Sequence, residues 1–356
     1  MAAGGLETLF LKVDGNCPDP EIIRQAGLVL RRGGLVAFPT ETVYGLGANA
    51  LDEAAVRKIF IAKGRPMDNP LILHISDMES IYLYADSVPA KARVLMERFW
   101  PGPVTFILRR GGRVPEAVSP GLTGLAFRMP DHPVALALIR VAGVPVAAPS
   151  ANLSGRPSPT TAEHVRRDLS GRIDMILDGG PAGLGLESTV VDMTGDLPVI
   201  LRPGGITPEQ IMDAVGPVEL DRSVEVAGET VKKPRSPGMK YRHYAPSAPL
   251  VLVEGDGAPV IAEIKRIALE YIGKGKKVGV ICRRENIGQY EGVLAVSAGA
   301  SNDPASVAAS LYGALRYFDD SGVDVILAEG VGNRGLGLAV NNRLRRAAGG
   351  KVVRVG

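Results

Sequence analysis

The sequence predicts an α/β protein in which a large mixed, twisted sheet is followed by a small parallel sheet. Three observations support this prediction. The chain has 356 residues, about twice the size of a typical domain. It is 46% hydrophobic and 22% charged, as expected of a globular protein with a packed core. Short apolar runs bounded by Gly, Pro, Asn or Asp alternate with helical patterns along most of the chain.

Residues 1–216 have the pattern of the large mixed sheet. Short apolar or β-branched runs predict strands at residues 35–38, 70–75, 104–108, 125–129, 144–148, 175–177 and 189–192. Amphipathic patterns predict helices between them, at residues 19–32, 52–63, 89–99, 133–141 and 161–169. Asp52 directly precedes one of these patterns, which is typical of a helix N-cap.

The periodic pattern is lost over residues 217–248, which we interpret as a linker. Its second part, KKPRSPGMKYRHYAPSA, has five Lys or Arg, one His and no acidic residue. Irregular segments of this length are usually either tethers or functional loops. Residues 249–356 then return to simple alternation and predict the small parallel sheet. The expected strands are 250–253, 277–281, 293–296 and 323–328, and the expected helices are 260–272, 304–318 and 339–348.

Composition argues against several classes of protein. The net charge of +3 is too small to identify a nucleic-acid binder. Cys17 and Cys282 cannot form a disulfide framework or a cysteine-based metal site, and they predict reduced thiols. The first residues lack a signal-peptide pattern, and no apolar run approaches the roughly 20 residues of a membrane helix. We therefore expect a cytoplasmic protein that does not enter the membrane.

Two motifs of the first domain place polar and basic groups beside predicted strands. PTETVYGLG (39–47) follows a strand and brings the Thr40 hydroxyl to its end, although a capped turn would explain it equally well. KGRPMDNPLILHI (63–75) places Lys63 and Arg65 on either side of a glycine, where both could reach one phosphate. Asn69 could bind phosphate or cap a turn. His74 lies on an apolar strand, where a buried core histidine is the alternative.

Further motifs add cations and hydroxyls. Arg128 lies inside the apolar strand of GLTGLAFRMP (121–130) and needs a buried partner, either a substrate carboxylate or an internal Asp. APSANLSG (148–155) forms a polar corner with Ser150 and Asn152, which could bind phosphate or ribose or simply make a turn. Ser188 enters one strand and Arg202 follows another. Together with Lys63 and Arg65, these residues predict a pocket for a strongly anionic ligand, although the chain lacks a P-loop.

Five of these motifs resemble the signatures of the YrdC family and occur in the same order. They are PTETVYGLG, KGRPMDNPLILHI, WPGPVTFIL (100–108), APSANLSG and ESTVVD (187–192). SPGMKYRHYAP (236–246) is similar to the linker of the longer, two-domain threonylcarbamoyl-AMP synthases, and GLGLAVNNRLRRAA (335–348) to the end of their C-terminal domain. The resemblance covers essentially the whole chain. It implies a YrdC-like domain followed by a small Rossmann-like domain.

The resemblance also implies a reaction. L-Threonine captures bicarbonate as a carbamate, which attacks the α-phosphorus of ATP and releases pyrophosphate. Threonylcarbamoyl-AMP then passes to a separate tRNA-modifying complex, the downstream partner. Mg²⁺ is expected to arrive with ATP, because it needs few protein ligands when phosphates hold it; the sequence identifies no metal-binding residue.

The resemblance assigns roles to individual residues. The expected threonine-binding residues are Thr40, His74, Arg128 and Ser188. The expected ATP-binding residues are Lys63, Arg65, Asn69, Thr123, Ser150, Asn152, Ser158, Arg202 and Tyr244, of which Lys63 and Arg65 are the expected catalytic cations. Lys240, Arg242 and His243 are expected to close over the nucleotide as a lid, with a simple tether as the alternative.

Two other functions remain open at this point. The basic linker could belong to an RNA-binding module without chemistry, whose RNA binding would weaken steeply with salt. A related enzyme could instead form a carbamoyl-adenylate on another acceptor. The threonine-binding set argues for an amino-acid substrate, and the long linker argues for the dedicated synthase.

Overall fold

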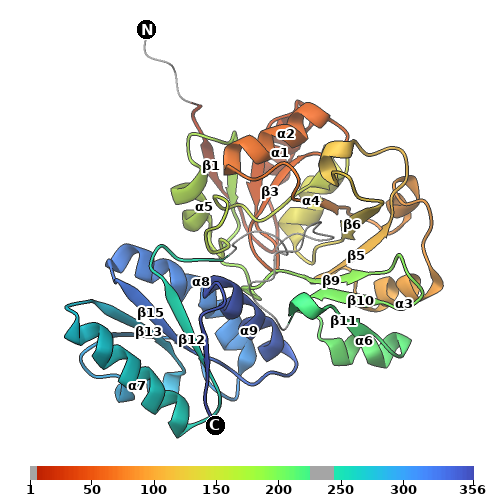
Figure 1. Ribbon diagram of the computed structural model, residues 1–356. Helices are drawn as coiled ribbons and strands as arrows, with labels where there is room; N and C mark the ends of the chain where they lie inside the picture. Colours follow the sequence, from red (N-terminus) through yellow and green to blue (C-terminus); the bar gives the residue numbers. More distant parts are fainter. Residues whose placement is uncertain (1–5, 225–243) are drawn as a thin grey trace.

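The computed structural model describes residues 6–224 and 244–356. Within these residues the strands form an eleven-stranded sheet and a separate five-stranded sheet (Figure 1). The larger sheet ends in sequence with β11 at Leu220, and the smaller one begins with β12 at Leu250. The predicted combination of a large mixed sheet and a small parallel sheet is therefore confirmed.

The larger sheet has the strand order β1-β8-β2-β3-β7-β4-β6-β5-β9-β10-β11. It is mixed, because β4 and β6 run parallel whereas β5 and β6 run antiparallel. Its strands are β1 (Leu9–Lys12), β2 (Val36–Phe38), β3 (Gly45–Asn49), β4 (Ile72–His74), β5 (Val104–Arg109), β6 (Gly124–Arg128), β7 (Val146–Ala147), β8 (Met175–Asp178), β9 (Thr189–Asp192), β10 (Val199–Arg202) and β11 (Glu219–Leu220).

Helices cover both faces of the larger sheet. One face packs against α1 (Pro20–Arg31) and α4 (Pro133–Ala142), which share an apolar cluster with β2 and β8. The other face packs against α2 (Glu53–Lys63), α3 (Ala90–Phe99), α5 (Ala162–Leu169) and α6 (Pro208–Val215). The α2 helix begins as the sequence predicts, because the Asp52 carboxylate accepts hydrogen bonds from the Ala54 and Ala55 amides.

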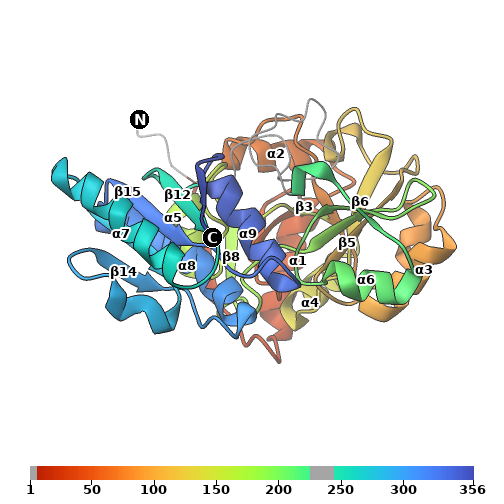
Figure 2. The ribbon, with the colours of Figure 1, turned by 60° about the horizontal axis from the view of Figure 1, so that its bottom comes forward.

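The smaller sheet is parallel throughout its described strands and has the order β14-β13-β15-β12-β16. Its strands are β12 (Leu250–Glu254), β13 (Val278–Cys282), β14 (Leu294–Ser297), β15 (Val325–Glu329) and β16 (Val352–Arg354). The helix α7 (Ala258–Gly273) covers one face, and α8 (Pro304–Ser321) and α9 (Leu336–Ala347) cover the other. These last two helices lie between the smaller sheet and the first domain (Figure 2).

Several elements lie outside the sequence-based assignment. The sequence-based assignment lacks β1, β3, β11, β16 and α6. Its last helix begins at residue 339, three residues after the start of α9. The β3 segment, GLGAN, is poor in the β-branched and aromatic residues that favour strands. It is a strand because β2 and β7 pair with it on both sides. Among the described residues, no helix is both long and apolar enough to cross a membrane.

Candidate functional site

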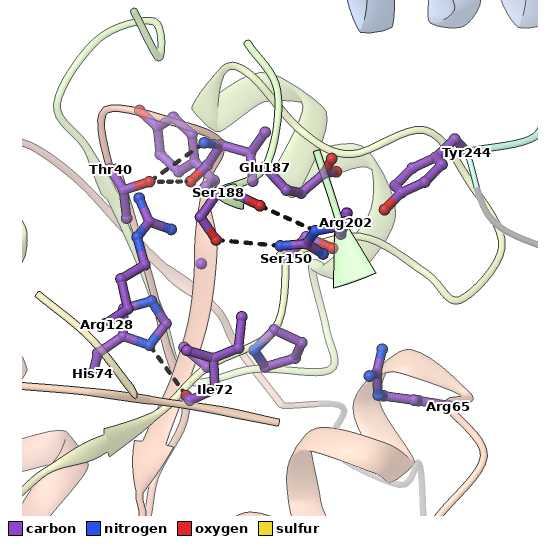
Figure 3. A pocket seen from close by; sticks show the side chains of 15 residues that line it. Thr40, Arg65, Ile72, His74, Arg128, Ser150, Glu187, Ser188, Arg202 and Tyr244 are labelled. Atoms are coloured by element: carbon purple, nitrogen blue, oxygen red, sulfur yellow. Dashed lines mark hydrogen bonds between the residues drawn. The ribbon is translucent and has the colours of Figure 1, made fainter. Parts of the chain in front are cut away.

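A pocket lies where several strands of the larger sheet meet their connecting loops (Figure 3). Strands β4, β6 and β10 contribute to it, as do the loops that follow β2 and β7 and the residues that precede β9. The residues that line it are Thr40, Val43, Tyr44, Gly45, Arg65, Ile72, His74, Arg128, Ala148, Pro149, Ser150, Glu187, Ser188, Arg202 and Tyr244. The pocket thus collects hydroxyls and guanidinium groups from segments that are far apart in the sequence.

All four residues of the expected threonine-binding set line this pocket. The Thr40 hydroxyl is fixed by its own loop, because it donates to the Val43 carbonyl at 2.7 Å. The Ser188 side chain is fully buried and its hydroxyl lies 2.7 Å from that of Thr105 on β5. Both hydroxyls are therefore held in place by neighbouring groups, which favours binding of a ligand of defined shape.

Arg128 is the last residue of β6 and points into the pocket (Figure 3). Its Nη2 donates to the Thr42 hydroxyl at 2.8 Å and lies 2.8 Å from the Glu41 carboxylate. Arg128 thus has an internal acid as its partner, but this acid is Glu41 of the PTETVYGLG loop and not the Asp that the sequence left open. The Arg128 Nε is buried without a hydrogen-bond partner among the described residues, so the guanidinium keeps donor capacity for a ligand.

His74 is buried at the end of β4, and its Nδ1 lies 3.2 Å from the Ile72 carbonyl. Burial, together with the nearby Arg128 cation, lowers the pKa of His74 from 6.5 to about 3. The imidazole is therefore neutral at physiological pH. It can shape the pocket and form hydrogen bonds, but it adds no positive charge to it.

This buried imidazole predicts a loss of stability in mild acid. Between the folded pKa of about 3 and the ordinary value of 6.5, the unfolded chain binds more protons at His74 than the folded chain does. Stability therefore falls as pH falls through this window, and the His74 contribution between pH 7 and pH 5 is about 2 kcal/mol. Urea unfolding at both pH values should show this loss.

The matched variant for this measurement is His74→Gln, which removes the titrating group. Its free energy of unfolding should change less between pH 7 and pH 5 than that of the unchanged chain. His132 and His164, whose pKa values burial also lowers, would still contribute in both proteins. Equal changes in the two proteins would show that His74 accepts a proton in the folded state.

Four residues of the expected ATP-binding set also line the pocket: Arg65, Ser150, Arg202 and Tyr244. Arg202 ends β10, and its guanidinium donates to the Ser188 carbonyl at 3.1 Å and to the Ser188 hydroxyl at 3.2 Å. Burial lowers the pKa of Arg202, but an arginine stays charged at neutral pH. Arg65 follows α2 and donates to the Pro70 carbonyl at 2.9 Å. The two cations approach the pocket from different elements.

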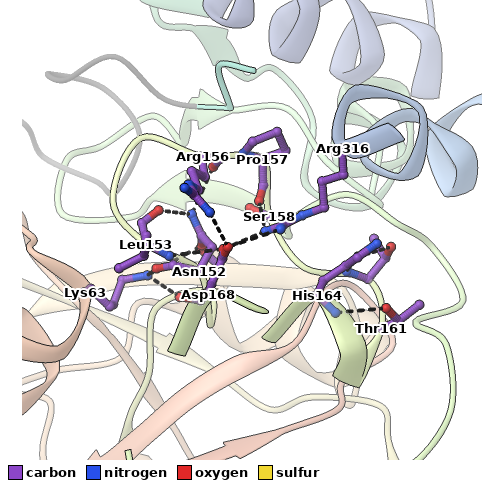
Figure 4. A network of polar contacts seen from close by, with 12 residues as sticks. Lys63, Asn152, Leu153, Arg156, Pro157, Ser158, Thr161, His164, Asp168 and Arg316 are labelled. Atoms are coloured by element: carbon purple, nitrogen blue, oxygen red, sulfur yellow. Dashed lines mark hydrogen bonds and ion pairs between the residues drawn. The ribbon is translucent and has the colours of Figure 1, made fainter. Parts of the chain in front are cut away.

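Lys63 does not line the pocket, in contrast to its expected role as a catalytic cation. Its ammonium group is buried beneath the APSANLSG loop and donates to the Ser150 and Asn152 carbonyls, both at 2.5 Å (Figure 4). Burial lowers the pKa of Lys63 well below its ordinary value. In this arrangement Lys63 supports the backbone that carries Ser150, because its Nζ donates to two carbonyls of that loop.

The remaining expected ATP-binding residues also lie outside the pocket lining. The Asn152 amide donates to the Leu153 and Arg156 carbonyls and so holds its own loop together. Ser158 donates to the Glu187 carboxylate at 2.5 Å. Asn69 is buried, and its carboxamide has no hydrogen-bond partner within the described residues.

Thr123 lies outside the pocket lining. It is exposed and precedes the first residue of β6, whereas Arg128 is the last. At roughly 3.3 Å per strand residue, the two lie about 16 Å apart along the strand. Thr123 is therefore at the opposite end of β6 from Arg128, and its expected contact with ATP stays a prediction.

The structure adds a carboxylate that the sequence analysis did not select. Glu187 is buried, lines the pocket and immediately precedes Ser188 in the ESTVVD motif. In the sequence, only its position in that motif pointed to a functional role for Glu187. An acid is otherwise unexpected in a pocket for anions, because it repels them. Its partners come from both domains and are described below.

The linker contributes one described residue to the pocket. Tyr244 is buried at a positive φ of 63°, and its ring stacks on Tyr312 of α8 with 5.6 Å between centroids. The expected lid residues Lys240, Arg242 and His243 lie outside the described residues. No group of three or more His, Cys, Asp or Glu side chains within residues 6–224 and 244–356 could hold a metal ion.

Comparison with known proteins gives consistent results. Residues 28–204 match the Sua5/YciO/YrdC family model, described as telomere recombination, and residues 206–349 match the threonylcarbamoyl-AMP synthase C-terminal domain. The threonylcarbamoyl-AMP synthase of Bacillus subtilis is 53% identical over 94% of this chain and 95% of its own. That of Pyrococcus abyssi is 50% identical over 94% and 96%. The crystal structure of P. abyssi Sua5 complexed with L-threonine superposes with a TM-score of 0.93 and 47% identity, covering 98% of this chain and 100% of that one.

Proposed function

Because the chain belongs to the Sua5/YciO/YrdC family and has the two-domain form of the threonylcarbamoyl-AMP synthases, we propose that its pocket joins L-threonine, bicarbonate and ATP. The products are threonylcarbamoyl-AMP, pyrophosphate and water; the water is released when the threonine amine captures bicarbonate as a carbamate. The observation that carries this proposal is the convergence of Arg65, Arg128 and Arg202 on one pocket with buried hydroxyls. The enzyme is a nucleotidyltransferase.

The chemistry explains why the pocket needs these cations. The threonine carboxylate, the carbamate and the triphosphate are all anionic, so bringing them together is repulsive. Arg128, with Thr40, His74 and Ser188 around it, suits the threonine carboxylate. Arg65 and Arg202 suit the phosphates. The carbamate oxygen then attacks the α-phosphorus and pyrophosphate leaves, a transfer that depends on positioning and charge stabilisation more than on a protein nucleophile.

Mg²⁺ is part of the proposal as the ion that accompanies ATP. The pocket offers the Ser150 and Ser188 hydroxyls as oxygen ligands, whereas its one lining carboxylate, Glu187, is already paired with Arg343. This set is too small for an all-protein site but fits an ion that phosphates and water mostly hold. When bound, the ion would neutralise phosphate charge, while the arginines hold and orient the two substrates.

The cellular setting follows from the reaction. The adenylate is consumed by a separate system that transfers the threonylcarbamoyl group to adenosine 37 of tRNA, so we place the enzyme in the cytoplasm with that system as its partner. Weak RNA binding by the basic linker would be compatible with this role. The relatives named threonylcarbamoyl-AMP synthase favour the enzyme over an RNA-binding module without chemistry.

Pyrophosphate release tests the proposal directly. Purified protein with Mg-ATP, L-threonine and bicarbonate should release pyrophosphate, and omission of any one component should stop most of the release. Release that continues without threonine would indicate another acceptor. A protein that releases no pyrophosphate but binds RNA in a salt-sensitive manner would overturn the proposal in favour of a binding module.

A further inference from the structure

Glu187 presents an electrostatic problem within the first domain. It lines the pocket that should receive phosphates and a carbamate, and its side chain is almost completely buried. An uncompensated carboxylate there would repel every anionic substrate and would itself be costly to bury. Within its own domain, Ser158 supplies a hydrogen bond of 2.5 Å and the nearby Arg202 cation lowers the pKa of Glu187, so compensation there is partial.

A cation in direct contact with Glu187 comes from the C-terminal domain. Arg343 of α9 donates from Nε to the Glu187 carboxylate at 2.7 Å, and its residue is 0% exposed. The Tyr312 hydroxyl of α8 lies 3.0 and 2.9 Å from the two carboxylate oxygens. Burial raises the pKa of Glu187, but Arg343, Arg202 and Ser158 together lower it below its ordinary value. The carboxylate is therefore ionised and paired.

Arg343 also contacts the backbone beside two pocket residues. Its Nη2 donates to the Glu187 carbonyl at 3.4 Å, directly before Ser188. Its Nη1 donates to the Pro203 carbonyl at 2.9 Å, directly after Arg202. The guanidinium thus links the backbone just before β9 to the backbone just after β10. Ser188 and Arg202, which hydrogen-bond to each other, lie between these two points.

The same side chain reaches the linker. The Arg343 guanidinium carbon lies 5.4 Å from the centre of the Tyr244 ring, which stacks on Tyr312. This is a cation–π contact in a site from which water is excluded, where such contacts are strongest. Arg343 therefore contacts three parts of the pocket. These are the Glu187 carboxylate, the backbone beside Ser188 and Arg202, and the Tyr244 ring.

We propose that Arg343 and Tyr312 are positioning residues for adenylate synthesis, and that the C-terminal domain completes the catalytic pocket by neutralising Glu187 and fixing Ser188 and Arg202. This inference rests on the proposed function. It assigns the domain an electrostatic role at the reaction site, beyond that of a tethered neighbour. Removing Arg343 should expose ATP to an unpaired carboxylate, whereas removing the carboxylate as well should cancel that repulsion.

The test is a double-mutant cycle on the full chain, with pyrophosphate release as the readout. Arg343→Met should lower kcat/KM for ATP by about 100-fold or more, mainly through a higher KM, because it leaves a buried charge unpaired. Adding Glu187→Gln to this variant should recover at least about tenfold of that loss. Circular dichroism and thermal unfolding would establish that each variant is folded.

Two further variants keep the test decisive. Tyr312→Phe retains the ring stacked on Tyr244 but removes both hydrogen bonds to Glu187, and it should raise the KM for ATP about threefold to tenfold. This variant carries the test if Arg343→Met does not fold. The control is Asp320→Asn, which breaks an exposed ion pair of 2.5 Å between Asp320 and Arg167 of the two domains and should leave kcat and KM unchanged.

The outcomes separate the two proposals. An unchanged chain that releases no threonine-dependent pyrophosphate would remove the proposed function itself. An active chain whose folded Arg343→Met and Tyr312→Phe variants keep their KM for ATP would overturn the positioning role. A loss in Arg343→Met that Glu187→Gln does not relieve would equally overturn it, because a purely structural contact would not be rescued by removing its partner's charge.

Discussion

Arg128→Met is expected to lower kcat/KM for L-threonine by on the order of 10²- to 10³-fold. Arg128 on β6 pairs in register with His74 on β4, and its side chain is 5% exposed. Methionine fills a similar length but offers no donor to a carboxylate. The same change leaves the buried Glu41 carboxylate without its cation. Both effects oppose threonine binding, so the loss should appear mainly in the KM for threonine.

Two matched variants separate these effects. Arg128→Lys retains the charge but loses the planar pair of donors, and it should recover only part of the activity. Arg128→Met combined with Glu41→Gln removes the unpaired acid, so any defect that remains reports the lost contact to threonine. The measurement is pyrophosphate release as a function of threonine concentration. A wild-type KM for threonine in Arg128→Met would mean that the substrate carboxylate binds elsewhere.

The sequence predicted those features that depend on local patterns. Asp52 is the predicted N-cap of α2, and Arg128 lies on an apolar strand and at a ligand pocket, as its burial cost suggested. The resemblance brought together Thr40 and Ser188, which 147 intervening residues separate, because it supplied knowledge of the fold that spacing alone lacks. Predictions from local patterns succeed when the environment of a residue is set by its neighbours in the chain.

The same reasoning did not predict the direction of every side chain, and the expected roles of Lys63 and Thr123 stay predictions. Lys63 is at the end of α2 as expected, but its ammonium group points into the loop carbonyls of Ser150 and Asn152. Thr123 is adjacent to the correct strand but at its opposite end. Neither fact can be read from residue type or spacing, because each depends on how two distant segments pack against each other.

Glu187 shows a third limit of prediction from the sequence. An acid in an anion pocket has no rationale in the sequence of the first domain, because its cation lies 156 residues later in Arg343. The GLGLAVNNRLRRAA motif gave three arginines on one helix and could not indicate which of them is buried. In the structure Arg343 and Arg345 are both buried, but Arg343 pairs with Glu187 whereas Arg345 pairs with Glu254 within the smaller domain. The role of the C-terminal helix therefore follows from tertiary contacts alone.

Gly204→Ala should damage both stability and activity. A Cβ at residue 204 would lie 2.3 Å from the Thr189 nitrogen, 2.4 Å from the Ser188 carbonyl carbon and 2.5 Å from the Glu187 oxygen. All three are backbone atoms, so no side chain can rotate away, and the β9 entrance itself must move. Overpacking of this kind costs about 1–3 kcal/mol. A displacement of about 1 Å at Ser188 would lower kcat/KM by about 100-fold.

The control for this prediction is Gly112→Ala, since an added Cβ there meets no atom within 4 Å. Urea unfolding and pyrophosphate release should show no change for Gly112→Ala and losses in both quantities for Gly204→Ala. If Gly204→Ala kept the stability but lost activity, the β9 entrance would be able to shift at little cost, and the pocket would depend on its position more than the fold does. If Gly204→Ala kept both its stability and its activity, residues 187–189 would have to tolerate a displacement. Their contacts with Arg343 and Arg202 oppose such a displacement.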